Sequence, residues 1–122
     1  MIYTSRYARK GLNDAEHYAI RITRGAPRFP LAYQLREVLW DIAPPREALG
    51  IEDEDEFRRV YFAHLDRVGV ERIIQALDAA ERQAGKRKVL LLCFCGVDHA
   101  FCHRHLFAEW FHQETGVPIH EL

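Results

Sequence analysis

The sequence predicts a small single-domain α/β protein, a Rossmann-like three-layer sandwich around a mostly parallel sheet. Residues 89–94 form an unbroken apolar run, which is typical of a strand buried on both faces. Residues 103–115 then show apolar side chains at helical spacing, and residues 117–122 predict a closing strand. The order strand, helix, strand is the signature of a parallel sheet. The length of 122 residues suits one domain, residues 1–122, with a core of its own.

The first part of the chain is expected to add two strands and a helix. Residues 1–5 predict a short strand, and residues 17–23 alternate apolar and polar side chains with the period of a strand. Polar residues, glycine and proline interrupt the pattern over 6–16 and 23–30, which are therefore predicted loops. Residues 31–42 carry apolar side chains at helical spacing, which predicts a helix that ends at the prolines following it.

Two longer helices are predicted in the middle of the chain, after a short helical turn over residues 45–50. The acidic run 52–56 suits the solvated start of a helix, because carboxylates are favourable near the positive end of its dipole. An apolar stripe continues this helix to Val68. Residues 70–77 then carry apolar side chains at helical spacing, which predicts a second amphipathic helix that ends at Gly85.

The composition is that of an ordinary globular domain, with 48% hydrophobic and 29% charged residues and a net charge of −1. Without a basic excess, the chain is not expected to bind nucleic acid over a broad surface, although a local basic pocket is compatible with it. No apolar run reaches the roughly 20 residues that span a bilayer, so no membrane partner is expected. The N-terminal residues lack the pattern of a signal peptide, and the predicted location is the cytoplasm.

Cysteine and histidine gather in residues 93–105, directly after the predicted buried strand. All three cysteines lie within ten residues of one another, and their odd number argues for reduced thiols and against a disulfide scaffold. Ligands of parallel sheets bind beyond the carboxyl ends of the strands. This segment is therefore where we expect any chemistry of the chain to occur.

The helix after this segment begins with basic side chains. His103, Arg104 and His105 occupy its first turn, where the helix dipole disfavours cations. One interpretation is an anion site, in which Arg104 and the free backbone amides hold a phosphate or a carboxylate. The other is structural, with neutral histidines and with Arg104 paired to Asp98, Glu109 or a more distant acid.

Cys102 and His103 are the candidate catalytic residues. A thiol at a helix N-terminus beside arginine and histidine is expected to have a lowered pKa, and the thiolate is the form that attacks electrophiles. Cys93 ends the predicted strand and lies within reach of Cys102 across the turn. The structural alternative is that both cysteines are small buried apolar residues.

A metal site is the main alternative, with Cys93, Cys102 and a histidine as ligands of zinc or iron. Structural zinc takes four tetrahedral ligands, and the single residue between Cys93 and Cys95 is fewer than the usual zinc-binding spacing requires. The metal itself is not predicted. The soft or borderline donors of the segment are Cys93, Cys95, His99, Cys102, His103 and His105.

Two more basic loops are expected to face the same site. Ser5 and Arg6 follow the first predicted strand, and Arg24 and Arg28 follow the second. If both strands run parallel to the strand before Cys93, the loops meet at one edge of the sheet. The alternative is that these arginines are simply solvated. The predicted ligand-binding residues are Ser5, Arg6, Arg24, Arg28, Cys93 and Arg104.

Residues 1–5 (MIYTS), 23–28 (TRGAPR), 91–93 (LLC) and 101–104 (FCHR) together resemble one family, called domain of unknown function 488. Their order and spacing match it along nearly the whole chain. The resemblance implies a compact Rossmann-like fold, a largely bacterial distribution and a loose kinship with nucleotide-related α/β proteins. It also implies that Cys93 and the Cys-His-Arg turn belong to the family pattern. Other members often lack cysteine at the position of Cys95, which weakens a metal model that needs Cys95.

The sequence thus favours a protein that binds an anionic small molecule, nucleotide- or nucleoside-derived, at the Cys-His-Arg turn. A thiolate-assisted reaction is part of this hypothesis, and whether the chain is an enzyme stays open. The alternatives are a Cys/His metal-binding protein and a non-catalytic ligand-binding or interaction module.

Overall fold

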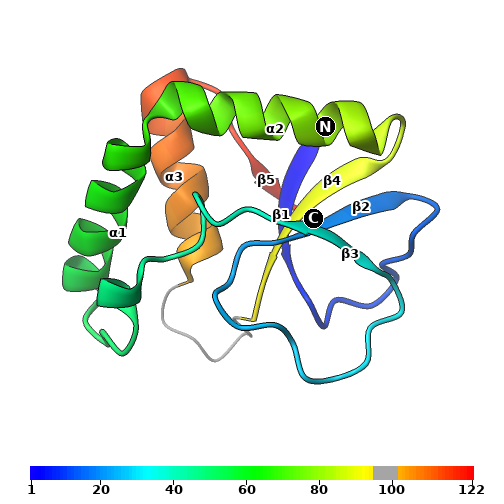
Figure 1. The fold of residues 1–122 in the computed structure, drawn as a ribbon, viewed down its shortest axis with the longest axis horizontal. Coiled ribbons are helices and arrows are strands. Elements are labelled where there is room, and N and C mark those ends of the chain that lie inside the picture. The colour runs from blue at the N-terminus through cyan, green and yellow to red at the C-terminus, as the bar shows by residue number, and fades with distance from the viewer. Residues whose placement is uncertain (95–101) are drawn as a thin grey trace.

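The computed structural model describes residues 1–94 and 102–122, which form an α/β fold around a five-stranded parallel sheet of order β3-β2-β4-β1-β5 (Figure 1). The strands are β1 (Ile2–Arg6), β2 (His17–Arg21), β3 (Leu35–Val38), β4 (Lys88–Cys93) and β5 (His120–Glu121). The helices are the short 3-10 helix η1 (Arg46–Ala48) and the α-helices α1 (Glu54–Val68), α2 (Val70–Ala84) and α3 (His103–Thr115). The predicted α/β class and parallel sheet are confirmed.

Strand β4 lies at the centre of the sheet, as its apolar sequence predicts. It pairs in parallel with β1 on one side, where Thr4 lies opposite Leu91, and with β2 on the other, where Ile20 lies opposite Leu91. All residues of β4 except Lys88 are buried. The strand is therefore covered on both faces, which is why its sequence shows no alternation.

All three α-helices pack on one face of the sheet. Leu65 of α1, Ile73 of α2 and Phe107 of α3 belong to one buried cluster, which also contains Val89 and Leu91 of β4. In Figure 1 the helices lie along the upper and left sides of the sheet, and the long loops lie at the lower right. The helices thus form the first outer layer of the sandwich.

Loops rather than helices cover the opposite face. Leu90 and Leu92 point to this face, since side chains alternate along a strand. Tyr7, Leu12 and Tyr33 pack against them in a second buried cluster. The three layers of the sandwich are therefore helices, sheet and loops, and the second outer layer contains the segments that follow β1 and β2.

The helix predicted over residues 31–42 is wrong, because the structure places β3 there. Leu35 pairs with Ala19 of β2, and Val38 pairs with Arg21. Leu35 packs on the loop face and Leu39 on the helix face, so the apolar spacing serves two faces of an extended chain. Pairing with β2 overrides a weak local preference for helix in this short edge segment.

The helical pair α1–α2 follows its sequence signals closely. Asp53 caps α1 by accepting a hydrogen bond from the backbone N–H of Glu56 over 2.9 Å, which confirms the acidic run as a helix start. Gly69 separates the two helices with a φ of 94°, a conformation that favours glycine. The predicted ends of α2 at Gly85 and of α3 at Gly116 are also confirmed.

The strand order creates a switch point between β2 and β4. From β2 the chain continues outward to β3, whereas from β4 it continues through α3 to β5 at the other edge. Neighbouring parallel strands whose connections diverge in this way leave a crevice beyond their carboxyl ends. The segments that follow β1, β2 and β4 all begin at this edge, so the parallel arrangement needed for their convergence is present.

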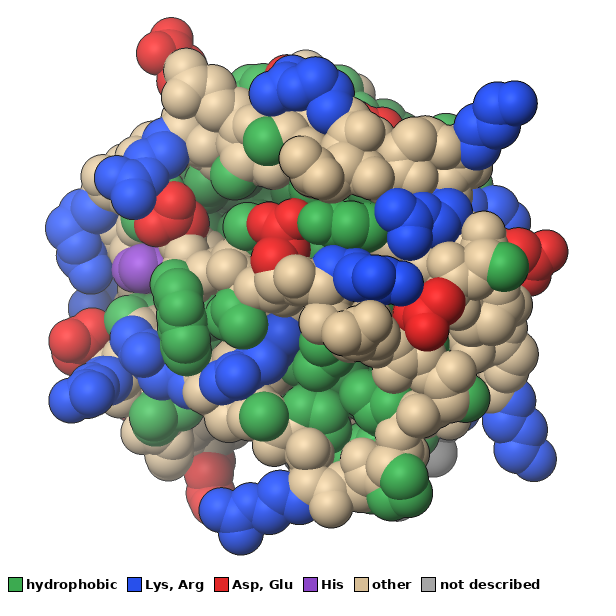
Figure 2. Space-filling view, turned by 45° about the vertical axis from the view of Figure 1, so that its right-hand side comes forward, with side chains coloured by type: hydrophobic (Ala, Val, Ile, Leu, Met, Phe, Trp, Pro, Cys, Tyr) green, Lys and Arg blue, Asp and Glu red, His purple; other side chains and the backbone are tan. Residues whose placement is uncertain are grey.

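The surface drawn in Figure 2 mixes basic, acidic and apolar side chains. Over this face, charges of opposite sign lie near one another. Among the described helices, none combines the length and the apolar character needed to cross a membrane.

Candidate functional site

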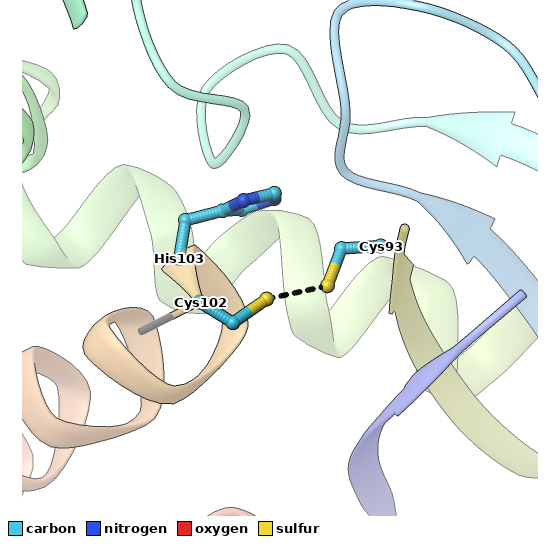
Figure 3. A group of neighbouring side chains, drawn as sticks. All are labelled: Cys93, Cys102 and His103. Carbon is cyan, nitrogen blue, oxygen red and sulfur yellow. Dashed lines mark hydrogen bonds between the residues drawn. The ribbon is translucent and has the colours of Figure 1, made fainter. Parts of the chain in front are cut away.

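Cys93 and Cys102 meet at the carboxyl edge of the sheet. Cys93 is the last residue of β4, and Cys102 is the N-cap of α3. Figure 3 shows their side chains pointing toward each other, with 2.8 Å between the Sγ atoms. Their exposed fractions are 0% and 4%. The turn therefore brings together two buried sulfur atoms, as the sequence spacing predicted.

Arg104 lies beside both sulfur atoms and is itself buried. Its Nη1 donates to Sγ of Cys93 over 3.0 Å and to Sγ of Cys102 over 3.2 Å. Its Nε and Nη2 donate to the carboxylate of Glu121 in β5, at distances of 2.9 to 3.1 Å. The guanidinium thus joins a carboxylate on one side to two sulfur atoms on the other.

These contacts favour the structural interpretation of Arg104 over direct contact with an anionic ligand. Its partner is a distant acid, Glu121, whereas Glu109 pairs with Arg58. Asp98, the third acid considered, lies outside the described residues. The first turn of α3 contains no acidic residue, as the sequence showed, and its buried cation is neutralised from β5 instead.

The charges of this network are held firmly. Although burial lowers the pKa of Arg104, its hydrogen bonds to Glu121 and Cys93 outweigh that effect and raise the pKa. Partial burial raises the pKa of Glu121, but its hydrogen bonds from Arg104 and Thr4 lower it overall. A guanidinium held against sulfur favours the thiolate over the thiol. Cys102 takes part in a disulfide and does not titrate, so the arrangement favours negative charge on Cys93, whose hydrogen bond and charge raise the pKa of Arg104.

His103 is neutral and faces the same region. Burial lowers its pKa to about 4, although its hydrogen bond to the backbone carbonyl of Ile22 acts in the other direction. Its Nε2 lies 3.0 Å from that carbonyl oxygen, so Nε2 carries the proton and Nδ1 keeps a lone pair. The Tyr61 ring meets the imidazole edge-on at 6.1 Å. The histidine thus links the end of β2 to the start of α3.

A pocket of about 320 Å³ opens between the ends of β2 and β4, at the switch point. His103 and Phe94 belong to its wall, so it adjoins the cysteine pair. Most of the wall is apolar, with polar contributions from the segment after β2. The lining residues are Thr23, Arg24, Gly25, Pro44, Ala48, Leu49, Gly50, Ile51, Phe57, Phe94 and His103.

The segment after β2 is held in shape by its own hydrogen bonds. Arg21 donates from Nε to the carbonyl of Thr23 over 2.9 Å and from Nη2 to the carbonyl of Arg24. Thr23 donates its hydroxyl to the carbonyl of Gly25 and therefore accepts from the Tyr7 hydroxyl, each over 2.7 Å. Hydrogen bonds within the protein therefore fix the shape of this wall of the pocket.

The remaining predicted ligand-binding residues separate into two groups. Arg24 lines the pocket, and Arg6 lies opposite Cys93 in the β1–β4 register. Arg28 is exposed. Thr4 lies on the same face of the sheet as Cys93, and its hydroxyl donates to Glu121. Ser5 follows Thr4 in β1, so its buried side chain points to the opposite face. The structure therefore brings Arg24, Cys93, Cys102, His103 and Arg104 into one region, places Arg6 beside Cys93 on the neighbouring strand, and leaves Ser5 and Arg28 outside it.

Sequence reasoning missed Glu121, Arg21 and Trp40. Glu121 reaches Arg104 only because β5 pairs with β1, where Thr4 lies opposite Glu121. Arg21 and Trp40 meet because β3 pairs with β2, and the ring centre of Trp40 lies 5.2 Å from the guanidinium carbon of Arg21. Predicting a strand, and not a helix, at residues 35–38 would have placed Trp40 near Arg21.

The candidate metal ligands also meet in part. One ligand atom from each of Cys93, Cys102 and His103 lies within 4.8 Å of the others. His105 is exposed and lies 3.6 Å from Glu121, and the candidates Cys95 and His99 fall outside the described residues.

Comparison with known proteins identifies the family of this chain. The family model described as the active DUF488-N3 subclade matches residues 1–115, which include every residue of the cysteine turn and of the pocket. No curated protein and no solved structure matches the chain. Since the match covers most of the sequence, it confirms the family resemblance, and the chain belongs to the DUF488 family.

Proposed function

We propose that this protein binds an anionic small molecule, nucleotide- or nucleoside-derived, in the pocket between β2 and β4. The bound molecule lies next to the Cys93–Cys102 pair, where a thiolate assists its reaction. The location in the cytoplasm remains a prediction from the sequence. The word "active" in the description of the matching subclade accords with a chemical role.

The observation that carries this proposal is the position of Arg104 between Glu121 and the two sulfur atoms. Burying a cation in contact with two cysteines is costly unless negative charge compensates it. Glu121 supplies one compensating charge, and a thiolate would supply another. A purely apolar role for the two cysteines would not require a guanidinium beside both sulfur atoms.

The roles of the other residues follow from their positions. His103 lines the pocket and keeps a lone pair on Nδ1, so it can accept a proton or a hydrogen bond. A cysteine thiolate beside the pocket assists the reaction, and Arg104 stabilises that charge without lining the pocket. Arg24 also lines the pocket and supplies positive charge for the ligand.

The test is a thermal-shift screen of reduced protein against nucleosides, nucleotides and their bases, followed by alkylation with iodoacetamide. A bound nucleotide is expected to raise Tm and to slow alkylation of Cys102. Cys102→Ser should still bind the nucleotide but should not turn it over. A panel in which no nucleotide raises Tm or protects the cysteines contradicts the proposal.

A metal site is the second candidate, supported by the approach of Cys93, Cys102 and His103. Two thiolates on one tetrahedral zinc lie about 3.8 Å apart, since each Zn–S bond is about 2.3 Å. The 2.8 Å between these sulfur atoms would have to increase by about 1 Å to admit the ion. A stoichiometric metal that is lost in both Cys93→Ser and Cys102→Ser would support this candidate.

The third possibility is a binding module without catalysis. It predicts that a ligand is recovered chemically unchanged, and that Cys102→Ser and wild type bind it equally well. Product analysis of the nucleotide identified in the screen separates this possibility from an enzyme.

A further inference from the structure

Arg24, a cation that lines the pocket, has surroundings different from those of Arg104. Its guanidinium carbon lies 5.8 Å from the ring centre of Trp40, which also stacks with Arg21. Arg21 is committed to the carbonyls of Thr23 and Arg24. Arg24 has no such acceptor: among the described residues, its buried Nε has no hydrogen-bond partner, and no acid lies within ion-pair distance.

A buried donor on a charged group is costly when it lacks an acceptor. Because Arg24 lines the pocket, a ligand in the pocket can supply that acceptor. The guanidinium fork matches a phosphate or a carboxylate, and its stacking on Trp40 limits how far it can turn away. The segment that carries it is fixed by Arg21, so the position of the charge is set before a ligand arrives.

The rest of the pocket fits a ring and not a second charge. Pro44, Leu49, Phe57 and Phe94 form much of its wall, and among the described lining residues the one arginine or lysine is Arg24. Its volume of about 320 Å³ is near the lower limit for small-molecule sites, which suits a single ring system. Leu49 and Phe94 remain 59% and 45% exposed at the rim, where a bound ring would cover them.

We infer that the ligand is a ring-bearing compound with one anionic group, which binds Arg24 at the rim while the ring occupies the pocket. Phosphomonoesters and aromatic carboxylates share this chemistry. Nucleoside monophosphates belong to the class, whereas inorganic phosphate lacks the ring and a nucleoside lacks the anion. The inference rests on the proposed function in placing the ligand in this pocket, but it needs no reaction at the cysteines.

The experiment is a protein-observed NMR titration with phenyl phosphate, benzoate, adenosine and uridine monophosphates, the two nucleosides and inorganic phosphate. Arg24→Met removes the charge but keeps a long side chain, and Arg28→Met is the matched control from the same loop. If Arg24→Met fails to fold, Arg24→Lys replaces it, since lysine keeps the charge and lacks the fork.

The inference predicts that at least one ring-bearing anion binds at the pocket and that Arg24→Met weakens it by about tenfold or more. Arg28→Met should leave that affinity within about twofold. Phosphate and the nucleosides should each bind at least about tenfold more weakly than the preferred ring-bearing anion. Arg24→Lys should also weaken binding, because it loses the bidentate contact.

The outcomes separate the inference from the proposed function. If phenyl phosphate or benzoate binds through Arg24 and neither nucleotide does, the inference holds and the nucleotide proposal fails. If a nucleotide binds equally well to wild type and Arg24→Met, the inference is overturned and the proposed function survives. Equal binding of inorganic phosphate, or no binding by any ring-bearing anion at millimolar concentration, also overturns the inference.

Discussion

Arg104 donates a hydrogen bond from Nη1 to Sγ of Cys93 over 3.0 Å, from a position that is only 6% exposed. The same guanidinium contacts Sγ of Cys102 and the carboxylate of Glu121. The sequence placed this arginine in the first turn of a helix, where the dipole disfavours it. The contacts explain its presence. Arg104 neutralises the carboxylate of Glu121 on the edge strand β5 and donates hydrogen bonds to both sulfur atoms.

Replacing Arg104 should therefore raise the thiol pKa of the cysteine pair. In Arg104→Met, we expect an increase of about one pH unit or more, because the charge that favours thiolate is lost. The pH dependence of thiolate ultraviolet absorbance measures it, in reduced protein that also carries Cys95→Ser. Arg58→Met, which breaks the half-exposed pair with Glu109, is the control and should titrate like its parent. An unchanged thiol titration in Arg104→Met would show that Arg104 does not control this charge.

His103 should make stability depend on mildly acidic pH. Burial lowers its pKa to about 4 from an ordinary value of 6.5, so between these values the unfolded chain binds more protons than the folded one. Stability is therefore complete above about pH 6.5 and falls as the pH drops toward 4, by up to about 3 kcal/mol.

Urea unfolding at a series of pH values tests this dependence. In His103→Gln, the loss between pH 6.5 and pH 4 should shrink relative to wild type. His112→Gln, from an exposed position on the same helix, should keep the wild-type slope. Equal slopes for wild type and His103→Gln would contradict a buried neutral histidine at this position.

Arg21 is expected to act on the ligand through Arg24. It donates to the carbonyls of Thr23 and Arg24 and stacks on Trp40, so Arg21→Met should loosen the segment that carries Arg24. We predict weaker binding of the preferred ring-bearing anion, by about three- to tenfold, with a loss of stability near 1 kcal/mol. Titration calorimetry and urea unfolding of the same variant measure the two effects. A variant that loses stability but binds with wild-type affinity would assign Arg21 a structural role only.

Tyr61 provides a test of the core beneath the site. Its hydroxyl donates to the carbonyl of Ile42 over 2.6 Å, and the side chain is 0% exposed. In Tyr61→Phe the carbonyl loses its partner in a buried position, at a cost of about 1 to 3 kcal/mol. Tyr3→Phe, whose hydroxyl makes only an exposed contact with Met1, should change stability by less than about 0.5 kcal/mol. Urea unfolding of the two variants gives the comparison, and equal stability of Tyr61→Phe and wild type would contradict the buried hydrogen bond.

The central fold was predictable because its signals are local. The apolar run before Cys93 and the helical spacing that ends at Gly116 specify β4 and α3 without knowledge of the rest. The proximity of Cys93 and Cys102 follows from that strand–turn–helix order. The approach of the two cysteines was therefore predictable from sequence.

The parts that failed depend on pairing between distant segments. Leu35–Val38 is four residues long and forms a strand only against β2, so its own pattern did not distinguish strand from helix. Glu121 is 17 positions from Arg104 and reaches it through the pairing of β5 with β1. Neither contact has a signature in the sequence, and both determine what the basic side chains do.

Native mass spectrometry with elemental analysis of the same sample tests the central claim most directly. Wild-type protein incubated with a mixture of nucleotides should contain no stoichiometric metal and should carry a phosphorylated compound, which Arg24→Met loses. Zinc or iron held stoichiometrically by wild type and lost in Cys102→Ser, with no nucleotide complex, would contradict the account and assign the cysteine turn to a metal.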